Sequence, residues 1–164
     1  MRWEALESPL VEFTVLGQAK PGGSKTAFQH PTTGRIIVKD SSANRPWRSQ
    51  VAAAAREVWE GELLRSPLRV EFRFVRPRPK SHRNARGEVK ASAPAFPTTR
   101  PDVLKLARAA EDALTGVLWA DDAQIVEEVL VKVFGEPERL EVRLWALAGE
   151  VTPVSNVVKP EVAG

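Results

Sequence analysis

The chain has 164 residues, a length that suits one domain with a substantial core. It carries 24 Lys and Arg against 21 Asp and Glu, so its net charge is only +3. Cysteine is absent and only two residues are histidine, which excludes a disulfide scaffold, a thiol nucleophile, a His-rich metal site and zinc or iron–sulfur sites with Cys ligands. No stretch approaches the roughly 18 apolar residues of a membrane-spanning helix, and Glu4, Glu7 and Glu12 interrupt the region where a signal peptide would be apolar. We therefore expect a cytoplasmic protein with no membrane partner.

Alternating apolar residues predict strands, and apolar residues three and four positions apart predict helices. In chain order the predicted elements are a strand over 10–17, a loop over 17–25, a hairpin of 26–29 and 35–39, a helix from 46 to about 60, a half-exposed strand over 68–75, a long loop to 99, a helix over 102–114, and strands over 124–134 and 139–147 joined by a hairpin turn at 135–138. We expect an α+β (mixed α/β) fold, in which a single mixed β-sheet of about four to six strands carries two main helices. The predicted domain covers 1–150, and a C-terminal tail covers 151–164.

The long loop is strongly basic, with seven cations against one acid, Glu88. Proline and glycine remove any periodicity, and loops of this length are commonly functional or disordered. We expect it to be poorly ordered without DNA and to contact phosphates, whereas a solvated surface loop is the alternative interpretation. Its cations are Arg76, Arg78, Lys80, Arg83, Arg86, Lys90 and Arg100.

The second predicted helix contains one residue that does not fit its pattern. Asp102 suits the N-cap, and Arg108 and Asp112 are spaced for an i,i+4 ion pair. An apolar face is formed by Val103, Leu106, Ala110, Ala113 and Leu114. The opposite face carries Leu104, Lys105, Arg108, Glu111 and Asp112. Leu104 is therefore an apolar residue on a charged face.

Three acids are placed to converge if this helix packs on the sheet. Asp102 begins the helix, and Asp121 and Asp122 precede the next strand. Carboxylates without Cys or His suit hard cations such as Mg²⁺ or Mn²⁺. Such a cation lowers the pKa of an attacking water, and nearby Lys and Arg position phosphates, which together would serve phosphodiester hydrolysis.

Three segments carry a resemblance to a known family: 100–108 (RPDVLKLAR), 111–116 (EDALTG) and 119–126 (WADDAQIV). With the loop that ends in Gly23-Ser24-Lys25, the chain resembles, over 11–147, the RusA family of Holliday junction resolvases, found mainly in phages and prophages. The resemblance implies a small homodimeric, Mg²⁺-dependent endonuclease without a small-molecule cofactor. Such an enzyme binds four-way DNA junctions and cuts two opposing strands symmetrically in DNA recombination and repair.

The resemblance also implies site residues. It places Asp102 and Asp122 at the catalytic aspartates, but a second aspartate of the helix start is replaced by Leu104. Glu111 lies about 10 Å further along the helix, on nearly the same face, and Glu111 or Asp112 could replace the missing ligand. The expected catalytic residues are Asp102, Asp122, Arg108 and Glu111. The expected metal ligands are Asp102, Asp122, Asp121, Glu111 and Asp112, with Mg²⁺ bound and Mn²⁺ as a substitute. The expected DNA contacts are the loop cations together with Lys20, Lys25 and Lys105.

Two alternatives stay open. A degraded metal site would leave a non-cleaving protein that binds branched DNA. The basic loop alone would also suit a small RNA- or ribosome-associated protein, which would need none of the acids.

Overall fold

The computed structural model describes residues 8–22, 26–39 and 44–147, so the predicted tail over 151–164 lies outside the described residues. The elements are β1 (Val11–Leu16), β2 (Thr26–Gln29), β3 (Ile36–Lys39), α1 (Arg45–Val58), β4 (Leu68–Arg76), η3 (Lys80–His82), α2 (Val103–Leu114), η4 (Asp122–Gln124), β5 (Ile125–Phe134) and β6 (Arg139–Ala146). Each predicted helix and strand is present within about two residues of its expected bounds.

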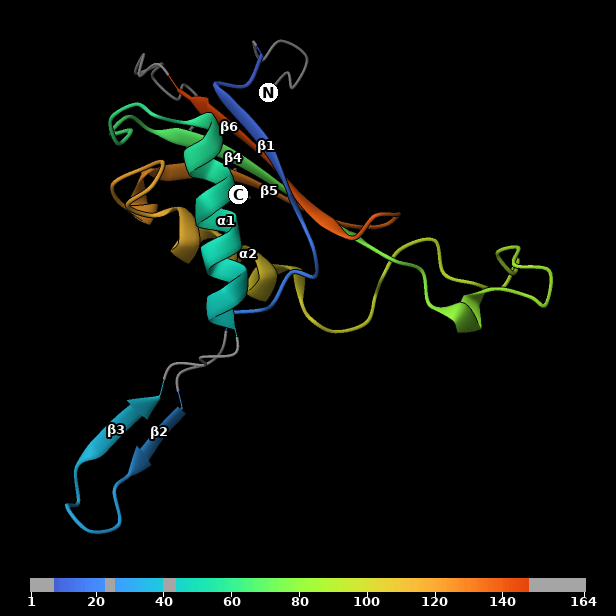
Figure 1. Cartoon of the computed structure of the whole chain (residues 1–164), viewed down its shortest axis with the longest axis horizontal. Coiled ribbons are helices and arrows are strands. Elements are labelled where there is room, and N and C mark those ends of the chain that lie inside the picture. The colour runs from blue at the N-terminus through green and yellow to red at the C-terminus, as the bar shows by residue number, and fades with distance from the viewer. Residues whose placement is uncertain (1–7, 23–25, 40–43, 148–164) are drawn as a thin grey trace, which may run out of the picture.

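The main sheet is mixed, as predicted, and has four strands in the order β1-β6-β4-β5. β4 and β5 are parallel, whereas β6 is antiparallel to both β1 and β4. β2 and β3 form a separate antiparallel hairpin that stands apart from the main sheet (Figure 1). The fold is therefore α+β, with the two main helices on one sheet.

The prediction that β5 and β6 form a hairpin is wrong. β4 lies between them, so the segment 135–138 passes over the end of β4 instead of making a tight turn. The Gly135 amide donates to the carbonyl oxygen of Arg76, and a Cβ at Gly135 would lie 2.7 Å from Val75 Cγ1. Glycine is needed here because the backbone passes so close to the strand that it crosses.

Both helices cover the same face of the sheet (Figure 1). α1 packs against β1 and α2, and α2 packs against β4 and β5. The alternation of apolar residues in β4 correctly predicted which of its faces is buried under the helices. Leu68, Val70, Phe72 and Phe74 are all buried. The opposing helix residues include Val51, Ala55, Leu106, Ala110 and Leu114, which are fully buried.

The other face of the sheet carries cross-strand ion pairs. Arg143 Nε lies 2.9 Å from Glu12 Oε1, and Arg73 Nη1 lies 3.6 Å from Glu141 Oε2. Arg69, expected on the exposed side of a half-exposed strand, is only 8% exposed. It lies over the Trp145 ring, and its Nη1 is 3.4 Å from Glu127 Oε1. Neighbouring strands on both sides of β4 thus cover a residue that alternation alone placed in solvent.

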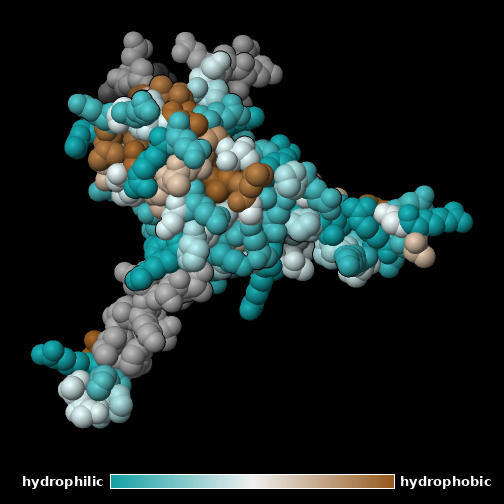
Figure 2. Space-filling model, in the orientation of Figure 1, coloured by the Kyte–Doolittle hydropathy of each residue, from teal (hydrophilic) through white to brown (hydrophobic). Residues whose placement is uncertain are grey.

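The segment 77–99 projects from the sheet and is covered mainly by hydrophilic side chains (Figures 1 and 2). It contains η3 and an isolated bridge between Arg83 and Val89, so it is less irregular than its composition predicted. Within the described part of the chain, no helix has both the length and the apolarity needed to cross a bilayer.

Candidate functional site

The exposed face of α2 forms one wall of an open pocket of about 410 Å³. Leu104 is 69% exposed and lines this pocket, as its position on the charged face of the helix predicted. The loop before β2 closes one side, because the Gly22 amide donates to the Lys105 carbonyl oxygen over 2.7 Å. The complete lining is Gly22, Leu104, Lys105, Ala107, Arg108, Glu111 and Glu128. Two acids, two cations and one leucine thus share a small concave surface.

Glu111 and Glu128 meet across this pocket, one from α2 and one from β5. Burial, followed by the hydrogen bond with Glu128 and the negative charges of Glu128, Asp122 and Asp112, raises the pKa of Glu111 to about 8. The Glu111 carboxyl is therefore mainly protonated at neutral pH, and the two side chains share a proton. Groups with strongly displaced pKa values in a cleft are common at functional sites.

Asp122 is held by two partners behind the pocket. The fully buried Trp119 directs its indole Nε1 to Asp122 Oδ1 at 2.9 Å, and the Thr115 hydroxyl donates to the same oxygen. Thr115 is fixed in turn because its Oγ1 lies 3.0 Å from the Glu111 carbonyl oxygen. Asp122 is therefore a positioned carboxylate, and its charge acts on Glu111.

The two adjacent aspartates have different surroundings. Asp121 is exposed and caps η4, with its side chain accepting from the Ala123 amide at 2.8 Å. Gln124 completes this capping box, and its Nε2 donates to the carbonyl oxygens of Leu64 and Ser66. Asp121 thus builds the turn, whereas Asp122 faces the acids of α2.

Asp102 lies at the N-cap of α2, as predicted, but its side chain does not cap the helix. Its Oδ2 lies 3.7 Å from Lys105 Nζ, and it borders a second pocket rather than the one that contains Glu111. Over nine residues the helix rises by about 13 Å, which separates the two acids. The structure therefore does not bring Asp102 together with Glu111 and Asp122.

The predicted i,i+4 pair of Arg108 and Asp112 does not form. Asp112 Oδ2 instead lies 3.9 Å from Arg48 Nη1 of α1. Arg108 packs against the loop at Gly22, where a Cβ would lie 3.3 Å from its Cγ. Among the described residues, no carboxylate lies within ion-pair distance of Arg108, so its charge is available to a ligand in the pocket.

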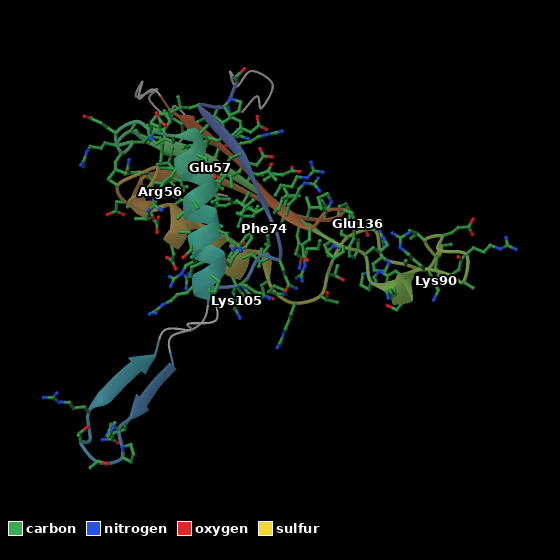
Figure 3. The ribbon with its side chains drawn as sticks, viewed as in Figure 1. Arg56, Glu57, Phe74, Lys90, Lys105 and Glu136 are labelled. Carbon is green, nitrogen blue, oxygen red and sulfur yellow. The ribbon has the colours of Figure 1, made fainter. Side chains whose placement is uncertain are left out.

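The predicted DNA-binding cations fall into separate groups. Four line the second pocket, namely Lys20, Arg76, Arg100 and Lys105. Arg78 and Arg83 line a pocket beside Phe134, and Arg78 stacks over the ring with its Cζ 4.1 Å from the centroid. Lys80, Arg86 and Lys90 are exposed on the projecting segment, and Lys90 lies far from Lys105 (Figure 3). Lys25 lies outside the described residues.

Some of these cations also hold the projecting segment together. Arg78 Nη1 donates to the Pro94 carbonyl oxygen at 2.7 Å, and Lys90 Nζ donates to that of Ser81 at 2.9 Å. Arg83 Nη1 donates in the same way to Gly87. These three side chains therefore have structural partners in addition to their predicted contacts with phosphate.

Sequence reasoning missed Glu128. The structure supplies what the sequence lacks, since Glu128 aligns with Val70 and Leu130 aligns with Phe72 in the parallel register. Paired positions of neighbouring strands point to the same face, so Glu128 faces α2. In the part of the chain that the structure describes, no three His, Cys, Asp or Glu residues form a ready-made metal cluster.

On the helix-covered face of the sheet, carboxylates and cations share one pocket along α2, a combination that suits a metal ion and a phosphate group. Residues 17–145 match the family described as endodeoxyribonuclease RusA. This match spans well over half of the chain, and the protein belongs to the RusA endodeoxyribonuclease family. The chain is also 27% identical over 140 residues to the uncharacterized protein YqaN of Bacillus subtilis (strain 168), covering 82% of this chain and 94% of that protein.

Proposed function

We propose that this protein is an endonuclease that binds four-way DNA junctions and hydrolyses phosphodiester bonds with the help of Mg²⁺, with Mn²⁺ as a substitute. Membership of the RusA family supports junction-resolving endonuclease activity. The observation that carries the proposal is the pocket in which Glu111 and Glu128 lie beside Lys105 and Arg108. The pocket combines carboxylate oxygens, which suit a hard cation, with side chains that attract phosphate.

The proposed metal ligands are Glu111 and Glu128, which line the pocket, together with Asp122, which is not part of the lining but whose charge acts on Glu111. All are carboxylates, which is the donor chemistry that Mg²⁺ prefers. Burial and the neighbouring carboxylates raise the pKa of Glu111, and a bound cation would favour its charged form in place of the proton, which supports the fit. A bound Mg²⁺ would supply a water of lowered pKa and would screen charge on the phosphate. Asp102 does not fit this donor set, because it borders the neighbouring pocket.

The chain's own cations are proposed to position the DNA strand. Arg108 has no carboxylate within ion-pair distance among the described residues, and its guanidinium can donate two hydrogen bonds to one phosphate. Lys105 lines both pockets and can contact the neighbouring phosphate. Trp119 and Thr115 hold Asp122 in place, so its carboxylate need not reorganise during the reaction.

Paired symmetric cuts require two active sites related by a two-fold axis, so we propose a homodimer. One chain carries one such pocket, and a closed dimer would present two copies to opposing strands. Sedimentation at micromolar concentration should show a species of twice the 18.1 kDa chain mass. A species of the single-chain mass alone would oppose the paired-cut mechanism while leaving cleavage of one strand intact.

A non-cleaving protein that binds branched DNA is the second candidate. It is favoured by Leu104 in the pocket and by the lack of a three-carboxylate cluster among the described residues. Binding and cleavage of a synthetic four-way junction, measured with Mg²⁺ and with EDTA, separates the two. The nuclease cuts only with Mg²⁺ and stops cutting in Glu111→Gln, while still binding. The non-cleaving binder shows equal affinity in both conditions and no products. An RNA-associated protein would instead bind RNA in preference to the junction and would lose nothing in Glu111→Gln or Asp122→Asn.

A further inference from the structure

The second pocket, of about 390 Å³, lies beside the carboxylate pocket at the N-terminal end of α2. Three parts of the chain that are distant in sequence form its walls. They are the loop 18–21 after β1, Arg76 at the end of β4, and the segment 100–105 that leads into α2. Lys105 lines both pockets, so the two form neighbouring parts of one surface along the helix.

Hydrogen bonds fix the walls of this pocket. On one side, Asn44 Nδ2 donates to the Pro21 carbonyl oxygen at 3.3 Å. On the other side, Lys132 Nζ donates to the carbonyl oxygens of Thr99 at 2.8 Å and Pro101 at 3.1 Å. The pocket is therefore formed in the protein alone, and a ligand would find its shape ready.

The lining of the pocket combines cations with apolar side chains. Its lining includes four cations and one acid, Asp102. Arg76 is paired with Glu138 at 3.7 Å, and Lys105 is paired with Asp102 at 3.7 Å. Among the described residues, Lys20 and Arg100 have no carboxylate within ion-pair distance. The apolar part of the lining is Ala19, Pro21 and Pro101.

The helix end adds to this charge. The Asp102 side chain turns to Lys105 and makes no capping hydrogen bond with α2, although the Asp102 carbonyl oxygen accepts from the Lys105 amide at 3.1 Å. The positive end of the helix dipole thus lies at the pocket, next to Lys20 and Arg100. A ligand that is anionic at one end and flat and apolar at the other matches both parts of the lining.

We propose that this pocket binds one unstacked nucleotide of the DNA strand, next to the bond that is cut. Lys20 and Arg100 hold its phosphate, and its sugar and base lie against Ala19, Pro21 and Pro101. This inference rests on the proposed function, because Lys105 joins the pocket to the carboxylates. A base that leaves the stack is most accessible at a branch point, so the pocket would favour junctions over continuous duplex.

The test uses the full chain, Ca²⁺ in place of Mg²⁺ to prevent cutting, and junctions that carry 2-aminopurine at successive positions around the branch. Fluorescence rises when this base leaves the stack. Ala19→Leu adds a larger apolar side chain to the lining without changing charge, and Arg100→Gln removes one of its cations. Arg56→Gln is the matched control, because Arg56 is in the last turn of α1, apart from Lys105 (Figure 3), and does not line this pocket.

The wild type should raise the fluorescence at one position, and Ala19→Leu should lose this signal while binding duplex within about twofold of wild type. Arg100→Gln should weaken junction binding about tenfold, as expected for one charge-assisted hydrogen bond, and Arg56→Gln should leave it unchanged. The proposal is overturned if Ala19→Leu keeps the signal, or if the two arginine variants weaken binding equally.

A competition experiment with free thymidine 3′,5′-bisphosphate tests the other possible ligand. A free nucleotide carries the same phosphate, sugar and base as a nucleotide within DNA. Weak, millimolar competition that Ala19→Leu removes supports a nucleotide presented by DNA. If the free nucleotide binds tightly and junctions give no rise in 2-aminopurine fluorescence, the proposal that the pocket binds a nucleotide of DNA is overturned. Failure of the proposed function is distinguishable, because a wild type that gives the fluorescence signal but never cuts would retain the pocket and lose only the nuclease.

Discussion

Glu111 of α2 and Glu128 of β5 share a hydrogen bond across the pocket that Leu104 borders. Two carboxyl groups lie close enough to share a hydrogen bond only when a proton or a cation neutralises the charge of one of them. The parallel pairing of β4 with β5 sets this contact, since it directs Glu128 toward α2. The carboxylate pair is therefore a property of the sheet as much as of the helix.

Glu128→Gln should abolish Mg²⁺-dependent junction cleavage and leave junction binding nearly intact. The amide keeps the shape and one hydrogen-bonding oxygen but removes a charged ligand. Glu57→Gln, on α1, is the matched control and should cut normally. Cleavage by Glu128→Gln at the wild-type rate would show that Glu111 and Asp122 suffice.

Stability without metal should fall as the pH rises. The pKa of Glu111 is raised to about 8 in the folded protein, so the native state binds more protons than the unfolded chain in the range below this value. The contribution of protonated Glu111 to the free energy of unfolding is present in full at about pH 4 and is lost as the pH approaches about 8 to 9. Glu128 on β5, Asp122 on η4 and Asp112 on α2 are the negative groups that act on it.

Urea unfolding in EDTA at about pH 5, 7 and 9 measures this effect. Glu111→Gln should flatten the decline and should gain most stability relative to wild type at the highest pH. Equal pH profiles for the two proteins would show that Glu111 has an ordinary pKa.

Leu104→Asp should increase cleavage at low Mg²⁺ concentration, because it adds a carboxylate to the wall that contains Glu111. Leu104 is 69% exposed, so the stability change should stay within about 0.5 kcal/mol. Leu104→Asn controls for polarity without charge. If wild type is inactive and Leu104→Asp restores cutting, the natural site is a degraded one.

Thr115→Val should reduce cleavage more than it reduces stability. The variant removes the hydroxyl that donates to Asp122 and leaves Trp119 as the remaining fixed donor. We expect a stability loss of about 1 kcal/mol and a weaker apparent affinity for Mg²⁺ in cleavage assays. Thr115→Ser keeps the hydroxyl and loses the methyl group, so it should stay near wild type in both, whereas a role for the methyl group in packing alone would impair the serine variant and spare the valine variant.

The sequence predicted α2 and its exposed Leu104 correctly because helical periodicity depends on local spacing alone. It could not predict the position of β6 between β1 and β4, since a four-residue connection is typical of a hairpin. Gly135 was the only local sign of a close crossing, and glycine is common in ordinary turns.

The candidate site was predicted in part. Glu111, Lys105 and Arg108 line one pocket, and the charge of Asp122 acts on Glu111, because the helix and the start of the strand meet on one side of the sheet. The roles of Asp102 and Asp121 as metal ligands remain predictions, although the structure places Asp121 in a cap and Asp102 beside Lys105. Glu128 was missed because the sequence does not show which strand lies next to α2.

The position of β1 affects how the chain is made as well as how it folds. Among the described strands, β1 pairs only with β6 in the main sheet, and β6 is the last of them to be synthesised. Val11, Phe13 and Val15 therefore cannot be buried in their native positions until synthesis has passed residue 146. Until β6 has been synthesised, β1 lacks its partner strand and exposes apolar side chains. A chain that stops before β6 should therefore be retained by chaperones or degraded.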